Sequence, residues 1–146
     1  MSGRLSEVQE ILRNHPDLAD VGWPEAEADI VRAEEALSVK FPESFREYLR
    51  RWGWISFGTN EYMGLGRSTQ SVVAETESIR RIRALPASLV VVTDHEGDEY
   101  VCLETSLMKN GECPVVIWDS PSQSISRPRA PTFDQFLAMD LRDFIE

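Results

Sequence analysis

The first half of the chain repeats apolar residues at the spacing of an α-helix. Three segments each combine one apolar stripe with a charged opposite face, which predicts three amphipathic helices. Ser6 is expected to cap the first helix and Pro16 to end it, while Gly53 suits the end of the third. The predicted faces are Val8, Ile11 and Leu12 in residues 6–14, Ala26, Ile30, Ala33 and Leu37 in residues 25–37, and Phe45, Tyr48, Leu49 and Trp52 in residues 42–52.

The second half changes to the pattern of β-strands. Three stretches are rich in β-branched and aromatic residues, and a continuous apolar run such as "SLVVVT" is typical of a strand buried on both faces. Thr132 is a plausible cap for a C-terminal helix. The expected elements are strands at 88–93, 99–105 and 113–119, short strands or a ribbon at 54–66, a short helix at 71–86, a helix at 132–146, a connector at 19–25 and a proline-rich loop at 121–131.

Helices at both ends with strands between them favour an α+β fold, in which helices pack a mostly antiparallel central sheet. The chain has 146 residues, a usual length for one domain, and it shows neither an internal repeat nor a clear linker. We therefore expect a single domain over residues 1–146.

The charge balance narrows the class of partner. The net charge is -10 and the sequence pI is near 4.7, whereas binding to phosphate backbones or anionic membranes needs clustered Lys and Arg. An acidic surface favours a basic protein partner, and the alternative is that the net charge only keeps the domain soluble. No run is apolar enough to span a bilayer, and residues 1–16 lack the apolar core of a secretory signal, so we expect a cytoplasmic protein. Cys102 and Cys113 are expected to be buried, reduced thiols.

The stretch 93–105, "TDHEGDEYVCLET", concentrates acidic residues with a histidine and a cysteine. As a calcium loop it fails, because the glycine comes one position early and the twelfth residue is threonine. As a zinc site it lacks any short-spaced ligand pair, and Cys102 lies in an apolar strand that would suppress thiolate formation. We predict a hairpin turning at Gly97, with no metal and no other cofactor.

Four motifs in order resemble the SUKH superfamily. Residues 29–58 are similar to its opening pattern, with an Ala33-Glu34 step, a Phe41-Pro42 pair, an aromatic-rich helix and a glycine turn. Residues 85–105 resemble its central hairpin, in which a Gly-Asp step leads into Tyr-x-Cys-Leu-acid-Thr. The later strand and closing helix follow, so the match covers about residues 23–144.

The resemblance implies an α+β domain without enzymatic activity. Many bacterial members act as immunity proteins that bind and neutralise a polymorphic toxin, often a nuclease, and nucleases tend to be basic. The alternatives are a scaffold or regulatory protein-binding module and, less well supported, a carboxylate-based hydrolase. Acidic or aromatic groups in loops are the predicted partner contacts, each weighed against plain solvated surface: Asp94, Glu96, Asp98, Glu99, Asp119, Glu61, Tyr62 and Trp54.

Overall fold

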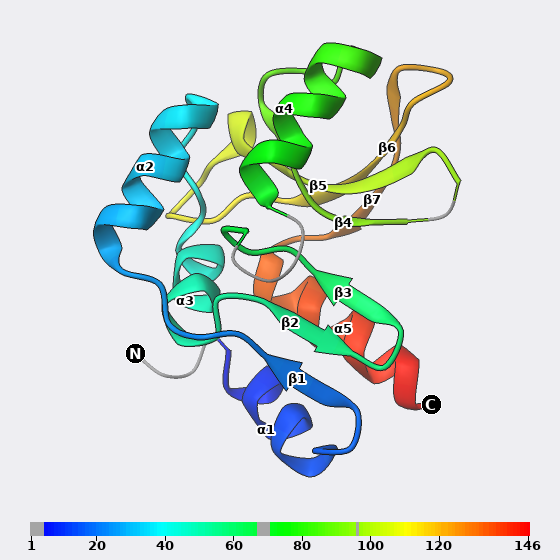
Figure 1. Ribbon diagram of the computed structural model, residues 1–146. Coiled ribbons are helices and arrows are strands. Elements are labelled where there is room, and N and C mark those ends of the chain that lie inside the picture. Colours follow the sequence, from blue (N-terminus) through cyan, green and yellow to red (C-terminus); the bar gives the residue numbers. More distant parts are fainter. Residues whose placement is uncertain (1–4, 67–70, 96) are drawn as a thin grey trace.

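The protein, as a computed structural model, is described over residues 5–66, 71–95 and 97–146, and its strands form two antiparallel sheets (Figure 1). The small sheet has the order β1-β2-β3 and the large sheet the order β4-β5-β6-β7. The α+β prediction is therefore confirmed, with the strands divided between two sheets. The strands are β1 (Ala19–Val21), β2 (Ile55–Phe57), β3 (Asn60–Tyr62), β4 (Leu89–Asp94), β5 (Glu99–Glu104), β6 (Val115–Asp119) and β7 (Ser124–Ala130).

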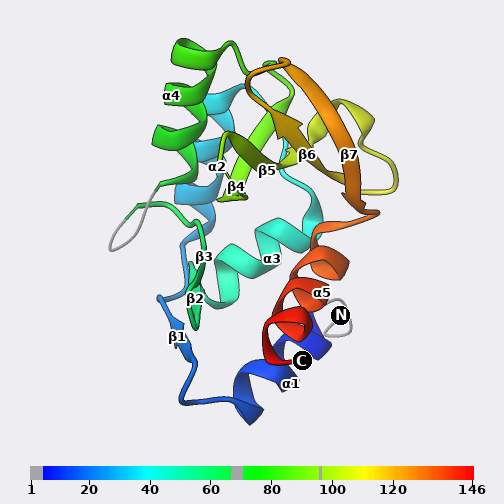
Figure 2. The same ribbon diagram turned by 90° about the vertical axis from the view of Figure 1, so that its right-hand side faces the viewer.

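The helices form layers on these sheets. Helices α1, α3 and α5 lie on one side of the small sheet, and none of the described helices lies on its other side (Figure 2). Helix α4 packs on β4 of the large sheet and contacts α2 (Figure 1). The helices are α1 (Ser6–Asn14), α2 (Glu27–Leu37), α3 (Glu43–Arg51), α4 (Val72–Arg83) and α5 (Phe133–Ile145), with a short 3₁₀ turn, η1 (Thr105–Leu107).

Two hydrogen bonds, one between backbone groups and one from a side chain, join the sheets at β3 and β4. The Met63 N–H donates to the Val92 carbonyl over 3.0 Å, and the Thr93 hydroxyl donates to the Glu61 carbonyl over 2.6 Å. This junction places the end of β4 beside the outer edge of β3. The acidic hairpin and the glycine-containing ribbon, which are far apart in the sequence, thereby become neighbours.

Aromatic side chains from α3 and α5 fill the core under the small sheet. The ring of Phe133 lies 5.0 Å from Phe45 and 5.2 Å from Tyr48, and all three side chains are fully buried. Burial of one such ring stabilises the fold by about 1.5–3 kcal/mol. The Tyr48 hydroxyl lies 2.9 Å from the carbonyl oxygens of Tyr62 and Met63, so it also holds α3 against β3.

Two strands lie where the sequence predicts irregular structure, and both predictions are wrong. β1 falls in the connector 19–25 and β7 in the loop 121–131. Both are edge strands, and the first five residues of β7 are exposed, so no apolar alternation marks them. Pro128 is tolerated because an edge strand does not need every N–H for pairing.

The structure shows which residues cap α1 and α5 and whether the two cysteines are buried. Leu5, not Ser6, occupies the N-cap of α1, so that prediction is wrong. Thr132 caps α5 as predicted, with its hydroxyl 3.4 Å from the Gln135 N–H. Cys102 and Cys113 are buried as predicted, and burial raises the pKa of the Cys113 thiol to about 12.

Candidate functional site

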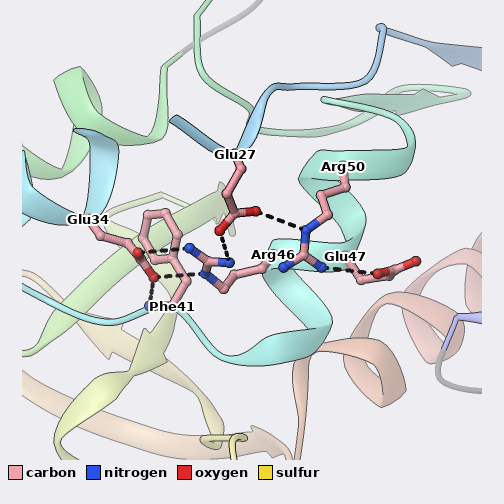
Figure 3. A network of polar contacts seen from close by, with 6 residues as sticks. All are labelled: Glu27, Glu34, Phe41, Arg46, Glu47 and Arg50. Atoms are coloured by element: carbon pink, nitrogen blue, oxygen red, sulfur yellow. Dashed lines mark hydrogen bonds and ion pairs between the residues drawn. The ribbon is translucent and has the colours of Figure 1, made fainter. Parts of the chain in front are cut away.

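A network of ion pairs joins α2 to α3 (Figure 3). Glu34 is only 5% exposed, and its Oε2 accepts the Phe41 N–H over 2.8 Å. Its two carboxylate oxygens also accept from the Arg46 guanidinium over 3.1 and 3.2 Å. Arg46 further contacts Glu27 at 2.6 Å, and Glu27 in turn pairs with Arg50 at 3.2 Å. Every charge in this network therefore has an opposite partner.

The electrostatics of this network indicate a structural role. Hydrogen bonding to Glu34 raises the pKa of the Arg46 guanidinium above its ordinary value. A hydrogen bond from Arg46 lowers the pKa of Glu27. The acidic residue of the Ala33-Glu34 step thus fixes the turn into α3 and is not available to a partner.

Two acidic residues at the tip of the β4–β5 hairpin, Asp98 and Glu99, pair with arginines. Asp98 Oδ1 lies 3.4 Å from Arg83 Nη1. Glu99 is half-buried, with Oε2 3.7 Å from Arg127 Nη1 and Oε1 3.7 Å from His95 Nε2. These two predicted contacts therefore already have partners within the chain.

Asp119 and Glu96 are the other predicted contacts near the hairpin tip. Asp119 pairs with Glu99 across β5 and β6, and its Oδ2 accepts the Ser122 N–H over 3.0 Å. The hydrogen bonds from Ser122 lower the pKa of the Asp119 carboxyl. Glu96, also predicted from the sequence, lies outside the described residues.

A hollow of about 440 Å³ opens between β3, the end of β4 and α5. Three of the residues that line it are acidic: Glu61 from β3, Asp94 from β4 and Asp140 from α5. Two of them, Glu61 and Asp94, were predicted separately as partner contacts. The fold thus brings these two predicted residues into one site.

The third carboxylate is held by neighbours. The Tyr62 hydroxyl donates to Asp140 Oδ2 over 2.5 Å, and Arg129 Nη2 donates to Oδ1 over 2.9 Å. Tyr62 is 1% exposed, because its side chain packs in the core beneath the sheet. Tyr62 thus orients Asp140 from inside the fold, and its contact with a partner stays a prediction.

The other two carboxylates of the hollow lack compensation. Within the described parts of the chain, neither Glu61 nor Asp94 has an ion pair or a side-chain hydrogen bond. Burial raises the pKa of Asp94, and burial together with the charge of Asp94 raises the pKa of Glu75 on α4. Negative charge is therefore held here at a cost to the fold, and a cation would relieve it.

The open face of the small sheet adjoins the hollow. The register pairs Asp20 with Ser56 and Ser56 with Glu61, so these side chains share one face. Gly22 donates its N–H to the Trp54 carbonyl over 3.0 Å, so these two residues form the next pair after Val21 and Ile55. They lie two positions from Asp20 and Ser56 and therefore on the same face of the sheet. Trp54 is half-buried, and Asp20 and Glu61 are exposed. An indole and two carboxylates therefore stand together on this sheet face.

The described residues form neither a metal cluster nor a membrane-spanning helix. Among the residues with described positions, no three His, Cys, Asp or Glu side chains are grouped so that they could hold a metal ion. Over the same residues, no helix has the length and apolar character needed to cross a bilayer.

Three acidic residues on or near the sheet face and the hollow were not predicted from the sequence: Asp20, Glu75 and Asp140. Asp20 was assigned to a connector, and period-two alternation along β1 would have been its only signal. Asp140 belongs to a helix and meets Tyr62 from 78 positions away, so no local pattern could have identified it.

Comparisons with known proteins agree with this fold. The family model SUKH_5, with the description "SMI1-KNR4 cell-wall", matches residues 6–141. The chain therefore belongs to this family, and the resemblance to the SUKH superfamily is confirmed. A protein from Pseudomonas syringae pv. tomato, known from a crystal structure, superposes with a TM-score of 0.58 at 18% identity, over 77% of this chain and 83% of that one. At this identity the likeness shows a shared fold.

Proposed function

We propose that the protein is a bacterial immunity protein that binds a cognate toxin domain and neutralises it by covering the active site. Three observations support the proposal: membership in the SUKH_5 family, a net charge of -10, and an acidic region in which Glu61 and Asp94 have no ion pair with the described residues. A basic toxin domain, such as a nuclease, is the partner that this charge suits.

The distribution of paired and unpaired carboxylates carries the proposal. Around Glu34 and at the hairpin tip, arginines of the same chain neutralise the acids. On the small sheet and in the hollow, Glu61 and Asp94 have no such partner among the described residues. Charges left unpaired on an accessible surface speed encounter with a basic protein and are compensated when it binds.

The proposed mode of action requires neither catalysis nor a cofactor. Burial raises the pKa of both thiols, which disfavours a thiolate nucleophile. The candidate carboxylates lie on an open face or in an open hollow. Neutralisation would instead follow from excluding the toxin's substrate, in the cytoplasm where the toxin acts.

Co-expression tests this function directly. The chain is expressed with the toxin domain encoded beside its gene, and growth and complex formation are measured. We expect the chain to restore growth and to co-purify with the toxin in one-to-one ratio. If it binds no neighbouring toxin and restores no growth, the immunity proposal is wrong. A scaffold or regulatory module would bind a native cellular partner but would not relieve toxicity.

Charge variants refine the test. The double variant Glu61→Gln/Asp94→Asn should slow association with the toxin and flatten its dependence on ionic strength. The matched control is Asp98→Asn/Glu99→Gln, which removes the same number of charges from the neutralised tip. If the two double variants behave alike, net charge alone governs association.

A further inference from the structure

We propose that the open face of the small sheet is the docking surface for an arginine-bearing segment of the partner, with the indole of Trp54 as a platform for one guanidinium. The proposal rests on the proposed function and specifies its contact chemistry.

The face is built by strand register. Asp20, Ser56 and Glu61 form one row across β1, β2 and β3, and Gly22 and Trp54 form the adjoining row. Helices α1, α3 and α5 all lie on the opposite side of this sheet (Figure 2). Among the elements described, none covers the outward face, so its side chains are available to a partner.

Gly22 leaves room for the indole of Trp54 at the end of β1. A Cβ atom added to Gly22 would lie 2.4 Å from Trp54 Nε1 and 2.5 Å from Cδ1, so any larger residue would push the ring away. The Nε1 atom is buried, with no hydrogen-bond partner among the described atoms. The ring edge that carries Nε1 is thus fixed against Gly22, and Trp54 remains half-buried on the sheet face.

Charge selects the partner for this surface. The two exposed carboxylates of Asp20 and Glu61 flank the sheet, and within the described chain neither has an ion pair. Glu61 also lines the hollow that contains Asp94, so the negative region is continuous. A guanidinium stacks on an indole and bonds a carboxylate with its planar fork, which a lysine ammonium cannot do. The occupant is therefore an arginine.

Binding to a defined peptide tests the surface without knowledge of the toxin. The probe is a ten-residue peptide of alternating Arg and Ser, and the control probe replaces Arg by Lys. Indole N–H resonances of the ¹⁵N-labelled protein are followed by NMR during titration at low salt. We expect the Trp54 resonance to shift most, and the Arg peptide to bind several-fold more tightly than the Lys peptide.

Three variants show which side chains bind the Arg peptide. Trp54→Leu should weaken Arg-peptide binding by about tenfold, the loss expected for a desolvated cation–π contact. Asp20→Asn/Glu61→Gln, which touches only exposed side chains, should weaken it with the fold intact. Asp98→Asn/Glu99→Gln at the hairpin tip should leave it unchanged. Thermal melts confirm that each variant is folded.

The outcomes separate this surface from the immunity function. If the peptide shifts only hairpin-tip resonances, or binds wild type and folded Trp54→Leu equally, the docking surface is wrong. If the chain neutralises a toxin and Trp54→Leu keeps full affinity for it, the docking surface is again wrong, while the immunity function stands. If the peptide binds at Trp54 but no toxin is neutralised, the surface stands and the immunity function fails.

Discussion

Two acidic regions of this protein use the same side chain in opposite ways. Around Glu34, the carboxylates of the buried Glu34 and the exposed Glu27 are paired with Arg46 and Arg50 (Figure 3). On the small sheet and in the hollow, Glu61 and Asp94 stand without partners among the described residues. The first arrangement stabilises the fold, and the second leaves charge available to another molecule. Pairing, and not acidity, therefore distinguishes a structural carboxylate from a candidate contact.

The largest effect is expected from Glu34→Gln. The change leaves Arg46 in a half-buried position with only Glu27 as its charged partner, and it weakens the bond to the Phe41 N–H. Removing one member of a buried ion pair costs about 3–5 kcal/mol, and the surviving Glu27 contact should hold the loss near about 3 kcal/mol. Urea unfolding at neutral pH measures it. A loss below about 1 kcal/mol would mean that this network contributes no more than a surface ion pair.

Tyr48→Phe tests the link between the two regions. The Tyr48 hydroxyl bonds the β3 backbone from α3, and its loss leaves buried carbonyl groups without that donor. We expect the free energy of unfolding to fall by about 1–2 kcal/mol. Faster hydrogen exchange at β3, with α2 unchanged, would show that the hydroxyl positions the strand that carries Glu61. Phe45→Leu, which disturbs the same core without touching this bond, is the control.

Removing the charges of Asp94 and Glu75 should raise the free energy of unfolding, whereas the two preceding changes lower it. Burial raises the pKa of Asp94 and Glu75, so both carboxyls hold their protons to higher pH in the folded than in the unfolded protein. Their contribution to stability is thus present at low pH and is lost as pH rises through the folded-state pKa. Asp94→Asn/Glu75→Gln should therefore stabilise the protein at pH 7 and have little effect near pH 3. Thermal melts at the two pH values measure the difference, and destabilisation at pH 7 would contradict it.

The smallest effect is expected at the hairpin tip. Asp98→Asn removes one exposed ion pair with Arg83, and such pairs contribute about 0–1 kcal/mol. The midpoint of urea unfolding should scarcely move, and toxin affinity should change less than in Glu61→Gln. A larger loss of affinity in Asp98→Asn would place the contact surface at the tip instead of on the small sheet.

The main helices and strands were predictable from the sequence because their buried positions carry apolar residues at a regular spacing. Helix α3 places Phe45, Tyr48 and Leu49 in the core at the predicted spacing, and β4 is the predicted strand with Leu89 to Val92 buried. The edge strands β1 and β7 were not predicted, since an exposed strand carries little apolar signal. The hairpin was predicted correctly, but its neutralisation depends on Arg83 and Arg127, which come from α4 and β7.

The sequence by itself determined the α+β class, the main helices, the acidic character and the SUKH resemblance, because each of these follows from local periodicity, composition or motif order. Only the tertiary structure decided which carboxylates are paired. Tyr62 was predicted to contact a partner and is buried beside Asp140, while Trp54, Glu61 and the unpredicted Asp20 meet on one sheet face through strand register. Charge pairing depends on distances of a few ångströms between residues distant in the chain, and such distances exist only once the sheets and helices have packed.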